Sequence, residues 1–293
     1  MYSLGINVGS SSVKAVLLEE KNIIWEKVIE HEGNFLNTLK QSLSERPFPD
    51  GTLCIATGTE GRYLLNMNNV LESVCIEQAI SELNISVDAV VSLGGENFVV
   101  YTIDKDGKII TNFSGNKCAS GTGEFFKQQL GRMDMKLTDI DSLPPDSKVH
   151  TLASRCSVFM KSDCTHKLNK GETTKGDIVL SLSNVMATKV IDFLKRARMS
   201  KGRVLLAGGV TQNRYIVSFL KENLPDIDFI VPKEAAYFEA YGAALLAAKA
   251  GAPMPPEDKR YRPGDSGFSS LSGLQTAEGR VTYLESRRGK IKP

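Results

Sequence analysis

The two halves of the chain repeat one order of strands and turns, and this repeat constrains the fold more than any other feature of the sequence. The stretch Tyr2 to Glu20 contains an apolar strand, the turn G-S-S-S and a second apolar strand, and a third strand is expected over Asn22 to Ile29. The same order restarts at Asp88 with D-A-V-V-S-L, the turn G-G-E-N, F-V-V-Y-T-I and, after another turn, K-I-I-T-N-F. The repeat predicts two similar α/β domains that face one another, each with a glycine turn in the cleft between them.

Apolar spacing predicts the remaining elements. Apolar residues recur at helical spacing in three segments and predict helices over Phe35 to Leu43, Leu71 to Leu83 and Asp177 to Arg198. A helix of small residues is expected over Glu234 to Lys249. Short apolar runs that end at glycine turns predict strands over Thr52 to Thr57 and Arg203 to Ala207.

These elements predict a division of the chain into two domains and a tail. The first domain comprises residues 1–86 and about 234–250, and the second comprises residues 87–233. Residues 251–293 are rich in Pro, Gly and charged residues and have no sustained periodicity, so they are predicted to be a tail or linker.

The composition excludes several classes of partner and compartment. A net charge of +2 with 24% charged residues provides no basic patch for nucleic acid. No apolar stretch is long enough to span a membrane and no signal peptide is evident, so a cytoplasmic protein with no membrane partner is expected. Five cysteines, an odd number, argue against a disulfide framework and for reduced thiols or metal ligation. Cys54 and Cys75 lie in apolar segments and are expected in the core.

Three glycine turns, each directly after an apolar strand, predict a nucleotide site. Each turn alone is a weak signal, but together they suit a polyphosphate, which backbone N–H groups and a lysine bind well. Neither a P-loop nor a dinucleotide-binding motif is present. The phosphates are predicted at the first two turns and the adenosine at the third; the residues are Gly9, Ser10, Ser11 and Lys14, then Gly94 and Gly95, then Gly208, Gly209 and Val210.

The stretch Ser114 to Lys127 places a cysteine just before a glycine pair that opens an apolar helix. Cys118 is followed by Gly121, Thr122 and Gly123, whose backbone N–H groups are predicted to face an anion at the start of the helix. Cys156 repeats the arrangement ahead of another helix. The alternatives are that both cysteines are small buried hydrophobes, or that Cys156 forms a zinc site with Cys164 and His166, whose spacing is poor for zinc.

These motifs resemble the activator (archerase) components of 2-hydroxyacyl-CoA dehydratases and the related ATPase subunits of benzoyl-CoA reductase. The resemblance covers roughly Leu4 to Ala250 and is most specific in the segments that contain the cysteines. The motifs that carry it are G-I-N-V-G-S-S-S-V-K, A-T-G-T-E-G-R, L-G-G-E-N, N-K-C-A-S-G-T-G-E-F-F, R-C-S-V-F and A-G-G-V-T-Q-N.

The resemblance implies two duplicated actin-like (ribonuclease H-like) domains with an interdomain nucleotide cleft for ATP or ADP with Mg. It also implies a homodimer in which Cys118 and Cys156 of each subunit ligate one shared four-iron four-sulfur cluster. The number of cysteines agrees with this arrangement, because a four-iron cluster needs four thiolate ligands and a two-fold dimer supplies two from each subunit. Ferredoxin or flavodoxin would donate the electron, and an iron-sulfur dehydratase or reductase would accept it.

Three positions depart from the family pattern. Asn7, Ser92 and Asn97 stand where the family has aspartates, and magnesium prefers carboxylate and water oxygens. Glu96 is the only carboxylate in the two phosphate turns and is the predicted catalytic residue. Hydrolysis is therefore expected to be slow, and two alternatives stay open: a non-hydrolysing nucleotide-binding iron-sulfur regulatory module, and a small-molecule kinase of the same superfamily.

Overall fold

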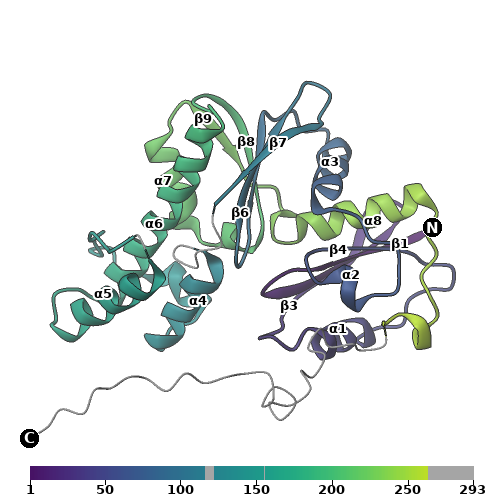
Figure 1. The fold of residues 1–293 in the computed structure, drawn as a ribbon, viewed down its shortest axis with the longest axis horizontal. Helices are drawn as coiled ribbons and strands as arrows, with labels where there is room; N and C mark the ends of the chain where they lie inside the picture. The colour runs from purple at the N-terminus through teal and green to yellow at the C-terminus, as the bar shows by residue number, and fades with distance from the viewer. Residues whose placement is uncertain (116–121, 155, 263–293) are drawn as a thin grey trace, which may run out of the picture.

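The computed structural model describes residues 1–115, 122–154 and 156–262 and contains two mixed β-sheets (Figure 1). The first sheet has the order β3-β2-β1-β4 and the second has the order β7-β6-β5-β8-β9. The first sheet consists of β1 (Tyr2–Val8), β2 (Ser12–Glu19), β3 (Asn22–Glu30) and β4 (Leu53–Thr57). The second consists of β5 (Ala89–Leu93), β6 (Phe98–Ile103), β7 (Ile109–Ser114), β8 (Gly202–Ala207) and β9 (Ile227–Ile230).

The two sheets are built in the same way, which confirms the predicted repeat. In each, the first three strands in chain order are antiparallel neighbours, and a later strand joins the first in parallel: β4 beside β1, and β8 beside β5. The match extends to single residues. Gly58 after β4 and Gly208 after β8 have φ values of +93° and +96°, and a Cβ at either would lie 2.3 Å from the carbonyl oxygen that ends the neighbouring strand, that of Val8 or Leu93. Only glycine suits both positions.

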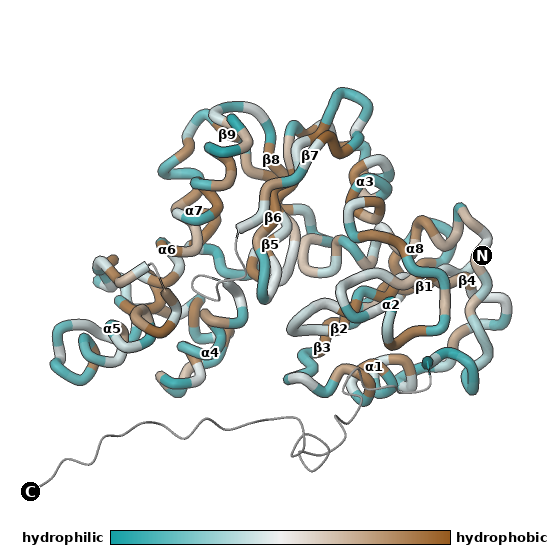
Figure 2. Tube along the Cα trace, viewed as in Figure 1, coloured by the Kyte–Doolittle hydropathy of each residue, from teal (hydrophilic) through white to brown (hydrophobic). Residues whose placement is uncertain are grey.

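The helices cover the sheets and fill the space beside them (Figure 1). The α-helices are α1 (Phe35–Ser44), α2 (Gly61–Leu64), α3 (Glu72–Leu83), α4 (Gly123–Arg132), α5 (Ser157–Asn169), α6 (Lys175–Arg196), α7 (Arg214–Asn223) and α8 (Phe238–Ala250). Short 3₁₀ helices are η1 (Leu137–Ser142), η2 (Gly209–Gln212), η3 (Ala235–Tyr237) and η4 (Glu257–Lys259). Hydrophobic residues run along the strands of the second sheet and along the neighbouring helices α6 and α7 (Figure 2).

Helix α8 packs between the first sheet and α3 at a distance that only glycine allows. A Cβ at Gly5 of β1 would lie 1.9 Å from the carbonyl oxygen of Ala240, and a Cβ at Gly242 would lie 1.9 Å from the carbonyl oxygen of Cys75 in α3. The small residues predicted for this helix therefore serve close backbone packing. The helix begins at Phe238 rather than at the predicted Glu234, because η3 precedes it.

The beginning of the predicted tail is attached to the first sheet. The backbone N–H of Cys54 donates to Ala252 O at 2.7 Å, and that of Met254 donates to Thr52 O at 3.0 Å. Further on, the backbone N–H of Asn66 donates to Arg260 O at 2.8 Å. These irregular contacts produce no periodicity that a sequence reading can detect. Residues 263–293 lie outside the described part, and the predicted domain boundaries stay a prediction.

Within the described ranges, no helix is both long and apolar enough to cross a membrane.

Candidate functional site

A cavity of about 350 Å³ lies between the two halves of the molecule. The first sheet contributes one wall through β2 and β3, and the second half contributes the other through the end of β5, α4, η1, η2 and α7. The predicted site residues that line it are Ser11, Lys14, Gly94, Gly95, Gly123, Gly209 and Val210. The structure therefore brings residues of all three predicted glycine turns to one cavity.

The first two glycine turns contact each other directly. A Cβ at Gly95 would lie 2.2 Å from Ser11 Oγ and 3.5 Å from Ser10 Oγ. Helix α4 holds the second turn from the other side, because the N–H of Gly123 donates to Gly94 O at 3.3 Å and the N–H of Glu124 donates to Gly95 O at 2.8 Å. These two amides of α4 are therefore bonded to the turn, which places the turn between the first half and the helix.

Several predicted residues lie beside the cavity without lining it. Gly9 closes the first turn, since its N–H donates to Ser12 O at 3.1 Å, and Gly208 is buried below η2. Thr122 is the N-cap residue of α4. Glu96, the predicted catalytic carboxylate, is exposed and is not part of the lining. The predicted residues Cys118 and Gly121 lie outside the described residues.

Charged and apolar side chains both line the cavity. Lys14 is 9% exposed, and no hydrogen bond or ion pair joins it to another described residue. The lining also contains apolar side chains, which suit the flat, weakly polar surface of a base; these are Phe126, Leu137, Ile140, Met186, Val210 and Ile216. The arrangement can therefore bind phosphates through Lys14 and the first turn and a base against the apolar wall.

Two carboxylates that the sequence reading missed lie next to the departures from the family pattern. Asn7 Nδ2 donates to Glu72 Oε1 at 3.2 Å, and Ser92 Oγ donates to Glu239 Oε1 at 2.8 Å. Burial raises the pKa of Glu72, the charge of Glu239 raises it further, and Lys14 and the hydrogen bond from Asn7 act in the opposite direction. The only sequence signal was that both carboxylates fall in the first turn of a helix, α3 and α8.

The described cysteines differ in their surroundings. Cys156 is partly exposed and is the N-cap residue of α5. Cys164 in the same helix is 3% exposed, and burial raises its pKa to about 11, so it stays a thiol. Cys54 and Cys75 are buried, as predicted. Cys156, Cys164 and His166 are all described and do not form a group of three that could hold a metal ion.

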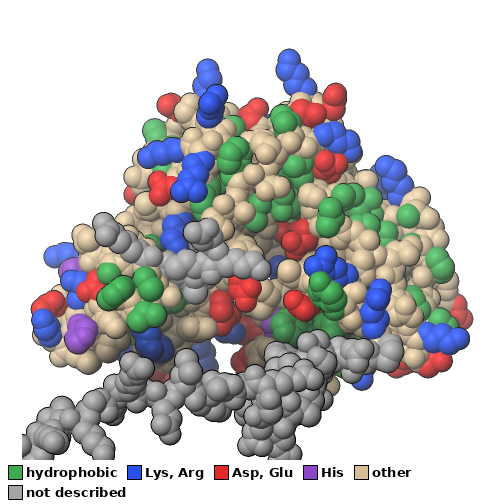
Figure 3. Space-filling view, viewed as in Figure 1, with side chains coloured by type: hydrophobic (Ala, Val, Ile, Leu, Met, Phe, Trp, Pro, Cys, Tyr) green, Lys and Arg blue, Asp and Glu red, His purple; other side chains and the backbone are tan. Residues whose placement is uncertain are grey.

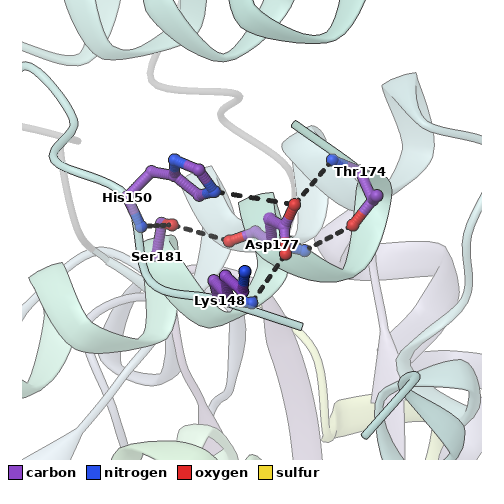
Figure 4. A network of polar contacts seen from close by, with 5 residues as sticks. All are labelled: Lys148, His150, Thr174, Asp177 and Ser181. Carbon is purple, nitrogen blue, oxygen red and sulfur yellow. Dashed lines mark hydrogen bonds and ion pairs between the residues drawn. The ribbon is translucent and has the colours of Figure 1, made fainter. Parts of the chain in front are cut away.

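Lys148 and His150 are held by a polar network at the start of α6 (Figure 4). Asp177 accepts the N–H of Lys148 at 2.6 Å and that of Thr174 at 2.8 Å, and its carboxylate lies 3.6 Å from His150 Nε2. Burial acts to raise the pKa of Asp177, but the hydrogen bonds outweigh it and the pKa is lowered. The N–H of His150 also donates to Ser181 Oγ at 2.8 Å. The backbone at Lys148 and His150 is therefore fixed on the helix.

Charged side chains of both signs are mixed on the face of the molecule seen in Figure 3. Lys, Arg, Asp and Glu side chains are scattered over this face rather than gathered in one basic patch. Beside Cys156, the side chains of Val158 and Phe159 in α5 are 65% and 68% exposed.

Comparison with known proteins relates this site to a family. Residues 54–247 match the BadF/BadG/BcrA/BcrD ATPase family. The chain is 31% identical over 262 residues to the (R)-2-hydroxyglutaryl-CoA dehydratase activating ATPase of Acidaminococcus fermentans, which covers 86% of this chain and 99% of that protein.

Solved structures show the same fold. The crystal structure of component A of the (R)-2-hydroxyglutaryl-CoA dehydratase from Acidaminococcus fermentans aligns with a TM-score of 0.74 at 27% identity, over 86% of this chain and 99% of that one. The activator of the 2-hydroxyisocaproyl-CoA dehydratase from Clostridium difficile with bound ADPNP aligns with a TM-score of 0.74 at 21% identity, over 98% and 100%. These likenesses confirm the predicted fold class of duplicated actin-like α/β units.

Proposed function

Because the chain belongs to the BadF/BadG/BcrA/BcrD ATPase family, we propose that it is an ATP-dependent iron-sulfur electron-transfer activator. Its partner would be an iron-sulfur enzyme of the 2-hydroxyacyl-CoA dehydratase type, which it reduces. The predicted resemblance to this family is confirmed by the match over residues 54–247. The observation that carries the proposal is one cavity that joins three glycine turns and Lys14, in a chain that also places a partly exposed cysteine at a helix start.

The nucleotide part of the proposal rests on the cavity. Phosphates would bind at Ser11, Lys14 and the Gly94–Gly95 turn, since a buried ammonium group, the Ser11 hydroxyl and the amide of Gly95 favour an anion. The base would contact the apolar wall near Val210. Since the turns of the two halves touch at Ser11 and Gly95, a nucleotide bound there would contact both halves and favour their closed arrangement.

The electron-transfer part rests on the cysteines. Cys156 and Cys118 would each provide a thiolate, and a homodimer would bring the four thiolates that one four-iron four-sulfur cluster needs. Such a cluster, when bound, supplies a one-electron redox centre. The N-cap position of Cys156 fits this role, because the positive end of the helix dipole at the start of α5 favours an anionic cluster. A cytoplasmic ferredoxin or flavodoxin would be the electron donor.

Iron analysis of anaerobically purified protein tests this proposal. About two irons per chain are expected, with visible absorbance that is lost in Cys156→Ala. Cys164→Ala is the matched control, because Cys164 lies in the same helix as a buried thiol, and it should keep the absorbance. A Cys156→Ala variant that retains the cluster would contradict the assignment.

A second function, a nucleotide-binding iron-sulfur module that does not hydrolyse ATP, is favoured by Asn7 and Ser92. Both are neutral residues at the ends of the central strands, where the predicted magnesium-dependent site would have carboxylates. Release of phosphate from ATP, measured with and without a reduced partner enzyme, distinguishes the two functions.

A further inference from the structure

His31 is bonded to two carbonyl groups of the first glycine turn. The residue directly follows β3, is 4% exposed, and is not among the described residues that line the cavity. Its Nε2 lies 3.2 Å from Gly9 O, and its backbone N–H donates to Ser11 O at 3.3 Å. A residue 22 positions from Gly9 therefore supports the turn from outside the β1–β2 hairpin.

The surroundings of the His31 ring define its tautomer and its orientation. The N–H of Gly33 donates to Nδ1 at 3.0 Å, so Nδ1 accepts and carries no proton. In the neutral ring the proton is then on Nε2, which faces Gly9 O, an oxygen that can only accept. The ring of Phe35 packs against the imidazole with the ring centroids 3.9 Å apart. Both ring nitrogens are therefore bonded, and Nε2–H donates to the turn.

These bonds set the direction of two peptide groups in the turn. In a trans peptide group the C=O and the N–H point in opposite directions. Because Gly9 O is directed at His31, the N–H of Ser10 points away from His31. Because Ser11 O accepts from His31, the N–H of Ser12 points away as well. Nothing among the described residues accepts the N–H of Ser10, and Ser11 and Ser12 line the cavity. The turn thus keeps its carbonyl groups on the His31 side and its N–H groups available to an anion.

We propose that His31 is a positioning residue for phosphate: it holds the first glycine turn in the orientation that offers N–H groups to the anion. The inference rests on the proposed nucleotide site and adds the residue that orients one part of it. His31 acts through the turn and does not touch the nucleotide. Without the Nε2–H donor, the peptide group between Gly9 and Ser10 can rotate, and a carbonyl oxygen then repels a phosphate where an N–H attracted it.

Calorimetry with pyrophosphate, ADP and adenosine tests this role, in EDTA so that no metal ion contributes. His31→Leu removes both hydrogen bonds of the ring and should weaken the binding of pyrophosphate and of ADP about five- to thirtyfold. The affinity for adenosine, which has no phosphate, should change less than about twofold. His150→Leu is the control, because His150 lies beside Asp177 at the start of α6, away from the turn, and all three affinities should stay unchanged.

Two amide variants separate positioning from packing and keep the test decisive if His31→Leu does not fold. His31→Gln retains a side-chain donor that can reach Gly9 O, and it should bind ADP within about threefold of wild type. His31→Asn carries the same amide on a side chain that is too short, and it should resemble His31→Leu. Equal ADP affinity in wild type and both amide variants overturns the proposal. An equal loss of adenosine and pyrophosphate binding in His31→Leu also overturns it, because it indicates a general effect on the site.

Hydrogen exchange of the nucleotide-free protein separates this inference from the proposed function. The amides of Gly9 and His31, which are bonded to Ser12 O and Ser11 O, should exchange faster in His31→Asn than in His31→Gln or wild type. If wild type binds neither ADP nor pyrophosphate, the nucleotide proposal is refuted. The exchange rates then decide about His31 alone: faster exchange in His31→Asn supports its hold on the turn, and equal rates in all three proteins overturn it.

Discussion

Glu72 makes the stability of the protein depend on pH, and the sign of the effect follows from its surroundings. Burial and the charge of Glu239 raise its pKa above the ordinary value of 4.5, so the folded protein holds a proton that the unfolded chain releases. This contribution to stability is fully present below pH 4.5 and is lost as pH rises through the higher folded pKa. The slope for one group is at most about 1.4 kcal/mol per pH unit.

Urea unfolding between pH 5 and 8 in EDTA measures this effect. Glu72→Gln should remove the decline, because glutamine stays neutral at every pH, and above the folded pKa the variant should be at least as stable as wild type. Glu82→Gln, in the same helix but paired with Lys21 at the surface, should leave the decline intact. A decline of equal slope in Glu72→Gln and wild type would refute the assignment to this residue.

At the scale of single residues, the glycine turns were predictable from the sequence because their signal is local, and Glu72 and Glu239 were not because their partners are distant in sequence. A glycine turn after an apolar strand is a local signal, and Gly94, Gly95 and Gly209 do line the cavity. Glu72 lies 65 positions from Asn7, and Glu239 lies 147 positions from Ser92. Only the packing of two helices against the sheets brings these pairs together, and no local pattern encodes it.

At the scale of elements, the position of α8 depends on the absence of two side chains. In Gly242→Ala the new Cβ would lie 1.9 Å from the carbonyl oxygen and 2.5 Å from the carbonyl carbon of Cys75, both backbone atoms that cannot rotate away. Helix α3 or α8 must then move, and we expect the free energy of unfolding to fall by about 2–3 kcal/mol. Chemical denaturation measures the loss.

Gly131→Ala in α4 is the control for this prediction. Nothing lies within 4 Å of a Cβ at Gly131, so alanine should be neutral or stabilise the protein by about 0.5–1 kcal/mol. If Gly242→Ala proves as stable as Gly131→Ala, the close packing of α8 does not limit stability.

The limits of helices were less predictable than their existence. Helix α6 begins at Lys175 rather than at the predicted Asp177, because Thr174 Oγ1 accepts the N–H of Asp177 at 3.1 Å and forms a capping box with it. Thr174 and Asp177, which form this box, precede Ile178, the first residue of the apolar stripe from which the helix was predicted. Capping residues therefore define the start better than the stripe does.

At the scale of the whole molecule, the strand repeat predicted two facing units because the alternation of strands and turns survives in both halves. Two other features could not be predicted. Residues 252–254 bond to the backbone at the start of β4, and residues 260–262 bond to the backbone at Leu64 and Asn66. These hydrogen bonds leave no trace in side-chain periodicity. The direct contact of Ser11 with Gly95 depends on how the two halves face each other, which no spacing within one half records.

An ion pair connects the two halves across the cavity, and we expect it to slow the dissociation of nucleotide. Glu30 in β3 pairs with Lys127 in α4, both line the cavity, and their side chains are 46% and 33% exposed. A pair this exposed is worth at most about 1 kcal/mol, so Glu30→Gln should speed dissociation of a fluorescent ADP analogue about two- to fivefold in stopped flow. Glu45→Gln breaks a similarly exposed pair, with Lys27, inside the first half and should leave the rate unchanged. Equal rates in Glu30→Gln and wild type would show that opening does not depend on this pair.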